Sequence, residues 1–486
     1  MLIFALGHTY TYECEKIARV FFPREKFEVK TEDGQGEGVR AVLEREGSDL
    51  VFTCRADLFG RTGTVSERMD ASSLRVSEEM ALARSIYKAL ASLTGRTPPW
   101  GVLTGVRPSK LMRKLIGAYG EKTALEIFTR DLLVREDKAR LALSVAKAED
   151  AGIALSRPES FSLYVSVPFC PTRCSYCSFV SHSIASAGKL IPEYVGALCE
   201  EIARTGRIAK DLGLRLETVY YGGGTPTSLS AEELSAVAET IENSFDLSSC
   251  REYTVEAGRP DTVDEKKLRA LKAAGVGRIS INPQSFENAV LSAVGRPHTG
   301  EDAIEKFGLA RSLGFDNINM DFIAGLPTDT PEGFRRSIET ALSLSPENIT
   351  VHTLALKTAA RIVTEKEDTE NGGITAGMVE TANALLSGAG YAPYYMYRQS
   401  KSLENLENVG WTRPGRDCLY NIYMMEEVHS VLAVGAGAVT KLKDPSSDTL
   451  ERVYNFKYPY EYVSRFAEIV SRKDRVTEFY HGLAEN

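Results

Sequence analysis

The feature that most constrains the fold is a repeated alternation of short apolar runs and amphipathic stretches between residues 160 and 360. Six runs rich in β-branched and aromatic residues predict strands: LYVSVPF, ETVYYGG, EYTVEAG, GRISINP, NINMDFIAG and NITVHTLAL. Helical patterns such as AEELSAVAETIENSF and GEDAIEKFGLARSLG separate them. This alternation indicates a parallel sheet with right-handed crossovers. Because six units are too few for a complete eight-fold barrel, we predict an α/β fold with a partial (β/α)6 barrel.

The chain of 486 residues is too long for a single core. We predict an N-terminal α+β domain over residues 1–156, the barrel over 157–362 and a C-terminal α+β extension, on the substrate side, over 363–486. In the first region EGVRAVLERE and SDLVFTCRADLFG alternate like antiparallel strands, whereas SEEMALARSIYKALASLTG and EDKARLALSVAKAEDAG have helical spacing. We interpret PPWGVLTGVRPSKLMRKLIG as a loop that caps a solvated helix, with a contact for an anionic ligand or a partner as the alternative. The role of this first region is open.

Composition and charge exclude several classes of protein. The net charge of −8 argues against a nucleic-acid binder that works by bulk electrostatics, although a local basic pocket for anionic small molecules stays open. No apolar run approaches the ~18–20 residues of a membrane span. The N-terminal stretch MLIFALGHTYTYECEKIARV lacks the basic region of a signal peptide. Five cysteines are scattered singly, which is not a disulfide framework, so we expect a reducing, cytoplasmic compartment.

Three further cysteines follow the first predicted barrel strand. They are Cys170, Cys174 and Cys177, in VPFCPTRCSYCSFV, with the spacing C-x3-C-x2-C. A structural zinc site takes four ligands, usually in two pairs, and His182 is spaced loosely for a fourth ligand. Thiolates are the usual ligands of iron–sulfur clusters. Three thiolates on a four-iron cluster leave one iron open to an outside ligand, so we favour a catalytic [4Fe-4S] cluster over zinc.

This spacing resembles the signature of the radical S-adenosylmethionine (SAM) enzymes, in which the open iron binds the amino and carboxylate groups of SAM. From about residue 161 to 360 the chain is similar to the oxygen-independent coproporphyrinogen III dehydrogenases and their relatives, which include haem chaperones. The matching stretches are LYVSVPFCPTRCSYCSF, YYGGGTPT, TVEAGRPD, NPQSF, VGRPHT and INMDFIAGLPTDT. The additional N-terminal region resembles the clostridial-type branch of these dehydrogenases.

The resemblance implies roles for residues at the ends of the predicted strands. Cys170, Cys174 and Cys177 match the cluster ligands. The residues that match contacts to SAM or the aromatic beside the cluster are Tyr164, Tyr176, Gly223, Gly224, Thr225, Glu256, Gln284, Arg296, Asp321, Ala355 and Val439. In the dehydrogenases, the matches of Gln284, Arg296 and Asp321 contact SAM or a second SAM molecule. Glycines allow a close backbone approach to the methionine moiety, and an arginine suits a carboxylate.

Ordinary structural roles remain open for some of these positions. The three glycines of YYGGGTPT are also compatible with a plain turn, and Arg296 with a surface ion pair. For GAGA, residues 435–438, we prefer close backbone packing to a contact with SAM.

The resemblance also implies a reaction and its partners. The 5′-deoxyadenosyl radical would take hydrogen from a propionate of coproporphyrinogen III, and loss of an electron and carbon dioxide would leave a vinyl group. Two such steps yield protoporphyrinogen IX for haem biosynthesis, with a reducing donor such as flavodoxin or ferredoxin as partner. Because the substrate carries four carboxylates, we expect basic residues over the barrel mouth. The candidates are Arg259, Arg296, Lys357 and Arg398.

Two positions depart from the dehydrogenase pattern. Phe179 stands where the dehydrogenases carry another cysteine, as it does in the chaperone relatives, and Ser166 replaces a histidine common to both groups. These changes leave SAM cleavage in place but keep alternatives open for the substrate and for a second SAM. The alternatives are a haem-binding chaperone without decarboxylase activity, a radical SAM enzyme that acts on haem itself, and a structural metal domain.

Overall fold

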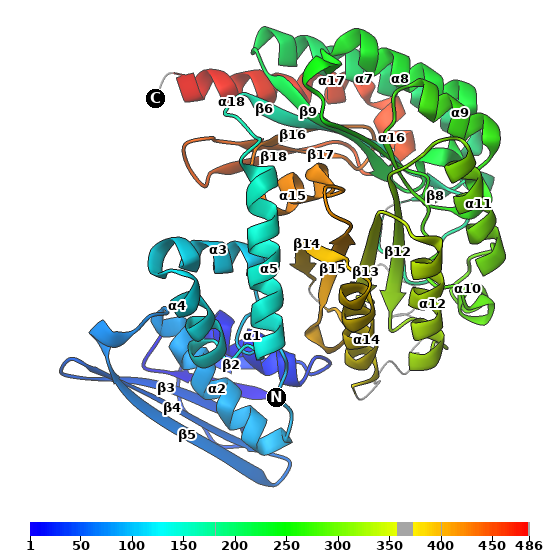
Figure 1. Ribbon diagram of the computed structural model, residues 1–486. Coiled ribbons are helices and arrows are strands. Elements are labelled where there is room, and N and C mark those ends of the chain that lie inside the picture. The colour runs from blue at the N-terminus through cyan, green and yellow to red at the C-terminus, as the bar shows by residue number, and fades with distance from the viewer. Residues whose placement is uncertain (180, 357–372, 400, 485–486) are drawn as a thin grey trace. The chain divides into compact units, whose positions relative to one another are not determined.

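The computed structural model describes residues 1–179, 181–356, 373–399 and 401–484 (Figure 1). The chain forms two compact units. The first comprises residues 1–147 and 396–407, and the second comprises residues 148–395 and 408–486. The division into three regions stays a prediction from the sequence.

The first unit is built on a five-stranded sheet with the order β2-β1-β3-β4-β5. Its strands are β1 (Leu2–Leu6), β2 (Glu28–Lys30), β3 (Gly38–Glu46), β4 (Asp49–Leu58) and β5 (Arg61–Asp70). β1 pairs in parallel with β2 and β3, whereas β3, β4 and β5 form the antiparallel meander expected from their alternating sequence. Its helices are α1 (Thr11–Phe21), α2 (Glu78–Thr94), α3 (Pro108–Tyr119), α4 (Glu121–Glu126) and α5 (Glu136–Ile153), of which α5 continues into the second unit. Short 3₁₀ and π turns cover Ala71–Ser73 and Ile127–Asp131.

Helix α2 packs directly on this sheet. A Cβ atom at Gly63 of β5 would lie 2.4 Å from the carbonyl oxygen of Ala89, so the absence of a side chain allows the helix to approach. The helix ends at Gly95, which adopts φ 69°, a backbone conformation that glycine accepts without steric cost. Glycines therefore set both the distance between α2 and the sheet and the point at which α2 ends.

A buried polar cluster joins residues 396–407 to the rest of the first unit. Glu407 is fully buried, accepts a hydrogen bond from Nε1 of Trp100 at 2.7 Å and forms an ion pair with the buried Lys138. Buried charges persist in proteins when they are paired and hydrogen-bonded in this way.

The second unit contains an eleven-stranded sheet with the order β14-β15-β13-β12-β11-β10-β9-β6-β16-β17-β18. The strands are β6 (Ser160–Val167), β9 (Arg215–Gly223), β10 (Glu252–Glu256), β11 (Arg278–Ser280), β12 (Ile318–Ala324), β13 (Asn348–Thr353), β14 (Ala392–Arg398), β15 (Glu407–Thr412), β16 (Ser430–Val434), β17 (Val439–Lys443) and β18 (Leu450–Tyr454). β6 and β9 to β13 are the six strands expected from the sequence, and they are parallel, which confirms the α/β barrel-like core. β16 adds a further parallel strand beside β6.

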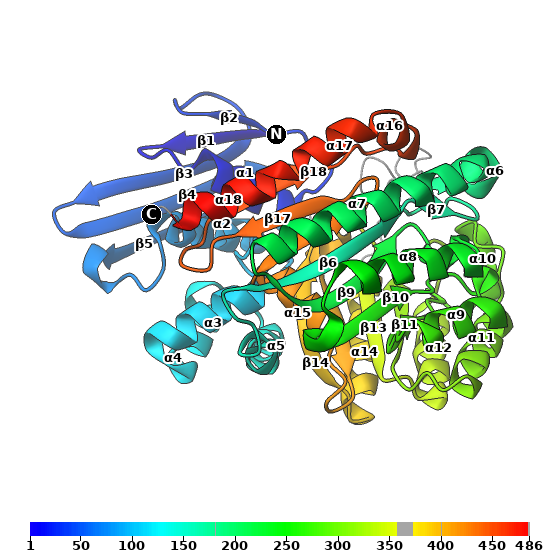
Figure 2. The same cartoon turned by 90° about the horizontal axis from the view of Figure 1, so that it is seen from above.

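The helices of the second unit follow the strands. They are α6 (Ile184–Ala187), α7 (Ile191–Asp211), α8 (Ala231–Ser244), α9 (Glu265–Ala273), α10 (Asn288–Ala293), α11 (Gly300–Ser312), α12 (Pro331–Leu344), α14 (Ile374–Gly388), α15 (Leu419–Glu426), α16 (Pro459–Ser464), α17 (Phe466–Arg472) and α18 (Asp474–Ala484). Figures 1 and 2 show α7, α8, α9, α11 and α12 along the outer face of the sheet. Capping boxes at Ser230 and Thr299 fix the starts of α8 and α11.

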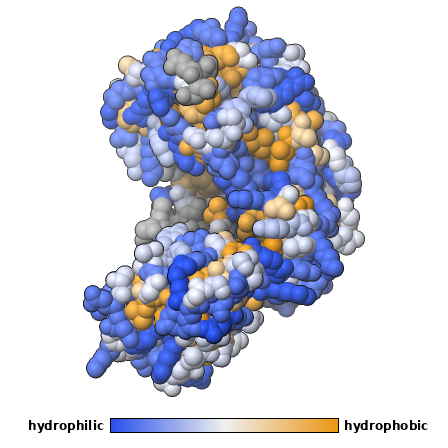
Figure 3. Space-filling view, turned by 90° about the vertical axis from the view of Figure 1, so that its left-hand side faces the viewer, coloured by the Kyte–Doolittle hydropathy of each residue, from blue (hydrophilic) through white to orange (hydrophobic). Residues whose placement is uncertain are grey.

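The surface shown in Figure 3 is mostly hydrophilic on both units, with hydrophobic residues in separate groups. Within the parts of the chain that the structure describes, no helix has the length and apolarity needed to cross a membrane.

Candidate functional site

The three clustered cysteines lie on the loop after β6, at the carboxyl end of the parallel sheet. Cys170 is on the short strand β7 (Phe169–Cys170), which pairs in parallel with β8 (His182–Ser183). Cys174 is buried, Cys170 and Cys177 are half-buried, and all three are free of disulfides. The carboxyl edge is where folds of this kind hold their ligands.

Hydrogen bonds attach the cysteine loop to the segment after α10. The amide N–H of Ser175 donates to the carbonyl oxygen of Val294 at 3.0 Å, and the hydroxyl of Thr172 donates to that of Gly295 at 3.1 Å. The loop is therefore held in place from outside its own sequence.

Hydrogen-bond donors lie beside two of the sulfur atoms. The hydroxyl of Thr225 donates to Sγ of Cys170 at 3.4 Å, and Nη1 of Arg259 lies 3.7 Å from Sγ of Cys174. Burial raises the pKa of Cys177 to about 11, and the neighbouring thiols Cys174 and Cys170 raise it further. Coordination to iron removes the thiol proton outright, and donors to sulfur tune such clusters.

The donor set at this loop fits a [4Fe-4S] cluster. Among the described residues, no three cysteine, histidine or acidic side chains lie close enough together to hold a single metal ion. A four-iron cluster binds each thiolate to a different iron, so its ligands stand farther apart than those of one zinc ion. Three free thiols that act electrostatically on one another, with two donors beside them, match that requirement.

The glycine loop at the end of β9 lies against the cysteine loop. A Cβ atom at Gly224 would lie 2.6 Å from the carbonyl oxygen of Phe169 and 3.0 Å from Sγ of Cys170. Gly223 adopts φ 108°, a conformation that other residues rarely take. A side chain at Gly224 would prevent this close approach of the backbone to a predicted cluster ligand. A plain turn does not require such an approach.

Glu256 ends β10 inside the same edge of the sheet. Its Oε1 accepts a hydrogen bond from the hydroxyl of Tyr220 at 2.6 Å. Burial raises the pKa of Glu256 to about 7, and the nearby carboxylate of Asp321 adds to the increase. A carboxyl group whose pKa is raised by burial and by a neighbouring charge is typical of a functional site.

Three tyrosine rings stack beside Glu256. Tyr164 and Tyr220 are neighbours in register on β6 and β9, with ring centroids 6.3 Å apart. Tyr420, on α15, lies 4.3 Å from the ring of Tyr220 and 6.2 Å from that of Tyr164. Burial raises the pKa of Tyr164 and Tyr420. The buried hydroxyl of Tyr420 has no hydrogen-bond partner among the described residues.

Tyr420 is a site residue that the sequence analysis missed. It lies in the segment LYNIYMMEE, whose apolar pattern predicts nothing beyond a helix. The signal that could have found it is its position shortly before VLAVGAGAVTK, which forms β16 beside β6. That pairing brings α15 to the strand that carries Tyr164.

Gln284, which follows β11, lies beside Asp321 on β12. The amide N–H of Gln284 donates to the carbonyl oxygen of Asp321 at 2.9 Å, and Gln284 has φ 70°. Its buried Oε1 finds no partner within the described chain. Burial opposes the charged form of Asp321, but hydrogen bonds from His352 and Asn319 outweigh it and hold the pKa below its usual value. Asp321 therefore offers a charged acceptor, and Gln284 an acceptor still without a donor.

The basic residues predicted over the barrel mouth are buried wherever the structure describes them, and their binding to a substrate stays a prediction. Arg259 is 4% exposed and binds Asp261 with both Nε and Nη2, at 2.8 and 2.9 Å. Arg296 is 5% exposed and donates to the hydroxyl of Tyr176 and to the carbonyl oxygen of Gly258, so it is no surface ion pair. These arginines support the loops around the cluster instead of facing solvent.

The remaining two basic candidates lie elsewhere. Arg398 belongs to the first unit, is 3% exposed, and donates to the carbonyl oxygens of Leu103 and Asn405. Burial lowers the pKa of Arg398 to about 10. Lys357 lies outside the described residues.

The two outlying SAM candidates are half-buried. Ala355 lies two residues after β13, and Val439 begins β17. In the adjacent GAGA segment, a Cβ atom at Gly435 would lie 2.4 Å from the carbonyl oxygen of Ser166. Close backbone packing, as preferred from the sequence, accounts for this glycine. The contacts of Ala355 and Val439 with SAM stay predictions.

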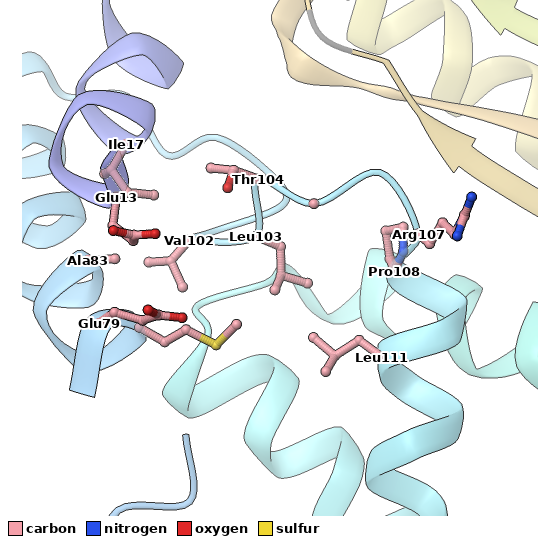
Figure 4. A pocket seen from close by; sticks show the side chains of 12 residues that line it. Glu13, Ile17, Glu79, Ala83, Val102, Leu103, Thr104, Arg107, Pro108 and Leu111 are labelled. Atoms are coloured by element: carbon pink, nitrogen blue, oxygen red, sulfur yellow. The ribbon is translucent and has the colours of Figure 1, made fainter. Parts of the chain in front are cut away.

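A separate pocket of about 170 Å³ lies within the first unit, between α1, α2 and α3 (Figure 4). The carboxylates of Glu13 and Glu79 lie on one side of it, Val102 and Leu103 line its wall, and Arg107 lies at the other end. This pocket contains none of the residues predicted to bind the cluster or SAM.

Comparison with known proteins agrees with the site. The model of the radical SAM superfamily matches residues 164–341. The chain is 40% identical over 395 residues to the oxygen-independent coproporphyrinogen-III oxidase-like protein HemZ of Bacillus subtilis, covering 80% of this chain and 79% of that protein. It is 41% identical over 197 residues to the heme chaperone HemW of the same organism, covering 40% of this chain and 51% of that one.

A solved structure shares the fold. Coproporphyrinogen III oxidase (HemN) from Escherichia coli, a radical SAM enzyme, superposes with a TM-score of 0.53 at 24% identity, covering 67% of this chain and 73% of that one. The chain therefore belongs to the radical SAM superfamily and, within it, to the family of oxygen-independent coproporphyrinogen III oxidase-like proteins. Membership implies a [4Fe-4S] cluster and SAM as cofactors.

Proposed function

We propose that this chain is a radical SAM enzyme that converts propionates of coproporphyrinogen III to vinyl groups by oxygen-independent oxidative decarboxylation. The observation that carries the proposal is a group of polar side chains near Glu256 and Asp321. Gln284 and Tyr420 have buried polar atoms with no partner in the described chain, and Glu256 has a raised pKa of about 7. Buried polar groups are almost always satisfied in proteins, so these unsatisfied ones favour a bound polar ligand.

The residues of this chain would divide the work of binding. Cys170, Cys174 and Cys177 would hold the cluster, with Thr225 and Arg259 donating to the sulfur atoms. When bound, the cluster supplies the electron that splits SAM into methionine and the 5′-deoxyadenosyl radical, which takes hydrogen from the substrate. The protein's share is to bind, orient and shield.

On the SAM side, backbone and carboxylates would set the orientation. Gly223 and Gly224 leave room for the methionine moiety to approach the backbone, because a side chain at Gly224 would meet Phe169 and Cys170. Asp321, whose pKa is held below its usual value, would accept hydrogen bonds from ribose hydroxyls. The stacked rings of Tyr164, Tyr220 and Tyr420 would exclude water from this side.

A second candidate function is a haem chaperone that keeps the cluster without decarboxylating a substrate. Phe179, which stands where the dehydrogenases carry a cysteine, favours it: the side chain is 67% exposed and offers no sulfur ligand. A relative that covers part of this chain is named as a heme chaperone.

One anaerobic experiment separates the two functions. Protein with a reconstituted cluster is given dithionite, SAM and coproporphyrinogen III, and the porphyrins are separated by chromatography after oxidation. In parallel, haem binding is titrated by absorbance. The proposal predicts vinyl-bearing products in proportion to the 5′-deoxyadenosine formed.

The other outcomes are equally definite. Stoichiometric haem binding without vinyl product would replace the enzyme by the chaperone. Formation of 5′-deoxyadenosine that rises with added haem, and not with coproporphyrinogen, would indicate a radical SAM enzyme that acts on haem.

A further inference from the structure

The pocket within the first unit has no part in the proposed function. It has a volume of about 170 Å³, and its lining residues all lie between residues 13 and 111, inside that unit (Figure 4). Because a cavity of about 150 Å³ admits benzene, this one has room for a ligand with an apolar body of about six carbon atoms. The apolar side chains that line it include Ile17, Met80, Ala83, Val102, Leu103 and Leu111.

The chain itself holds the apolar wall of the pocket in place. The amide N–H of Val102 donates to the carbonyl oxygen of Leu132 at 2.9 Å, and that of Leu103 donates to Trp100 at 3.0 Å. Gly101 adopts φ 54°, and a Cβ atom there would collide with the carbonyl oxygen of Leu132. Val102 and Leu103 are buried. The wall is therefore formed without help from a ligand.

Two carboxylates lie at one end of this wall. They belong to Glu13 on α1 and Glu79 on α2, both half-buried, and Figure 4 shows them at the same end of the pocket. Neither forms a hydrogen bond or an ion pair with the residues that the structure describes. Glu78, the neighbour of Glu79 in sequence, is by contrast paired with Arg45 at 2.7 Å. The two carboxylates at the pocket thus keep their full capacity to accept hydrogen bonds.

The pocket end that holds Glu13 and Glu79 is negatively charged. Each glutamate lies in the first turn of its helix, where the helix dipole favours the ionised form. Burial lowers the pKa of His8, which lies near Glu13, so this imidazole is neutral at pH 7. Among the 12 described residues that line the pocket, the one basic side chain is Arg107, and in Figure 4 its guanidinium points away from the carboxylates. A cation between the two carboxylates would relieve their mutual repulsion.

Three cations close to the two glutamates in sequence or space are engaged elsewhere. Nζ of Lys16, one turn further along α1, lies 4.9 Å from the ring centroid of Tyr12. Arg45 pairs with Glu78, and Arg75, which precedes α2, pairs with Asp131 at 2.8 Å. The cation that the pocket favours must therefore come from outside the chain.

The lining also indicates which kind of cation fits. Divalent metal ions take six or more oxygen ligands, and no group of three acidic, histidine or cysteine side chains occurs among the described residues. A hydrated ion would also gain nothing from an apolar wall. An alkyl ammonium satisfies both parts, because its N–H groups donate to carboxylates while its body covers apolar surface. The contact for an anionic ligand, left open from the sequence of this segment, is disfavoured by the two carboxylates.

We propose that this pocket binds a small aliphatic primary amine. The ammonium group lies between the carboxylates of Glu13 and Glu79, and the alkyl body lies against Val102 and Leu103. An ammonium carries three N–H donors, which suffices for both carboxylates. Binding is noncovalent and needs neither the cluster nor SAM, so this inference is independent of the proposed function.

The test is an isothermal titration of hexylamine into the full-length protein at pH 7. We expect saturable binding of one hexylamine per chain. Hexanol and hexanoate have the same alkyl length without the positive charge, so they should bind at least about tenfold more weakly. Propylamine keeps the charge but buries less apolar surface, and it should also bind about tenfold more weakly or less well still. Added salt should weaken the binding of hexylamine.

Variants with glutamine identify the carboxylates. Glu13→Gln and Glu79→Gln should each weaken the binding of hexylamine about tenfold, because each removes a charged acceptor and keeps the shape of the side chain. Glu44→Gln is the matched control, since Glu44 is an exposed glutamate of the first unit on β3, away from the pocket lining, and the affinity should stay unchanged.

Four outcomes would overturn the proposal. The first is the absence of saturable hexylamine binding, whether or not Mg²⁺ binds to the protein. The second is binding of hexanol or hexanoate as tightly as hexylamine. The third is equal affinity for hexylamine in the wild type and in both pocket variants. The fourth is tighter binding of a lysine blocked at its α-amino and carboxyl groups, which would replace the free amine by a protein side chain.

Discussion

Two carboxylates in the second unit differ in how completely the chain satisfies them. Glu201, on α7, is fully buried and accepts hydrogen bonds from the amide of Gly435 at 2.7 Å, Nδ2 of Asn455 at 2.7 Å and the hydroxyl of Tyr462 at 2.5 Å. It also pairs with Nζ of Lys473 at 2.8 Å. These partners join α7 to the turn after β16 and to the C-terminal segment.

Glu256, at the carboxyl edge of the sheet, has a single hydrogen bond from Tyr220 and a pKa raised by burial to about 7. This difference in hydrogen bonding distinguishes a structural carboxylate from one that can bind a ligand. Where every lone pair has a donor from the chain itself, the carboxylate holds elements together. Where capacity is left over, the carboxylate is available for a ligand.

We expect the largest effect from loss of a predicted cluster ligand. Cys174→Ala removes a predicted cluster ligand, so the brown absorbance and the bound iron should be lost while the fold persists. The measurement is iron content together with the absorbance spectrum after anaerobic reconstitution. Cys199→Ala is the control, because Cys199 lies alone on α7. Full iron content in Cys174→Ala would contradict the prediction that Cys174 binds the cluster.

Substitution of Glu201, whose oxygens all have partners in the chain, should lower the free energy of unfolding. Glu201→Gln leaves the buried ammonium of Lys473 without its counter-charge, and breaking a buried pair costs about 3–5 kcal/mol. Urea unfolding measures the change in free energy of unfolding. At pH 5, where Glu256 is mostly protonated in the folded chain, Glu256→Gln should change it by less than about 1 kcal/mol, since Glu256 has no ion-pair partner of this kind. Equal losses in the two variants would erase the distinction between the carboxylates.

Substitution of Glu256, which has a single hydrogen bond from the chain, should instead weaken the binding of SAM. We expect Glu256→Gln to weaken SAM binding by about 10- to 100-fold, the value of one hydrogen bond to a charged group. The measurement is an anaerobic calorimetric titration of SAM into cluster-loaded protein. An unchanged affinity in Glu256→Gln would place Glu256 outside the SAM site.

The smallest effect concerns pH. The pKa of Glu256 is about 7 when folded and ordinarily 4.5, so the unfolded chain binds fewer protons between these values. The stability of the apoprotein should therefore fall as pH rises from about 5 to 7, by about 1–2 kcal/mol for this partly exposed group. Glu256→Gln should lack this component. The difference between the urea-unfolding curves of the two proteins at pH 5 and 7 isolates it, and parallel pH dependence would refute the assigned shift.

The local sequence pattern was enough to predict the strands of the parallel core and the residues that lie at their ends. The runs that became β6 and β9 to β13 are apolar because both faces of a parallel strand are buried. The cysteines, the glycine loop and Glu256 lie at or just after the carboxyl ends of those strands, so their shared edge could be predicted.

Long-range pairing could not be predicted in the same way. VLAVGAGAVTK contains β16, which lies beside β6, and nothing in its own sequence identifies that neighbour. Tyr420 enters the site through the same pairing. The burial of the arginines could not be predicted for a related reason, because Arg259 and Arg398 contact partners far away in sequence, Thr172 and Leu103. Charge alone does not tell a solvent-facing arginine from one that supports a loop.

The most direct test of the account is the amount of 5′-deoxyadenosine that the protein forms from SAM. The protein is reconstituted anaerobically until iron and sulfide match one [4Fe-4S] cluster, reduced with dithionite and incubated with SAM. We predict 5′-deoxyadenosine from the wild type, strongly reduced amounts from Glu256→Gln and none from Cys174→Ala. Absence of 5′-deoxyadenosine from wild-type protein with a full, reduced cluster would contradict the assignment of this edge of the sheet to SAM.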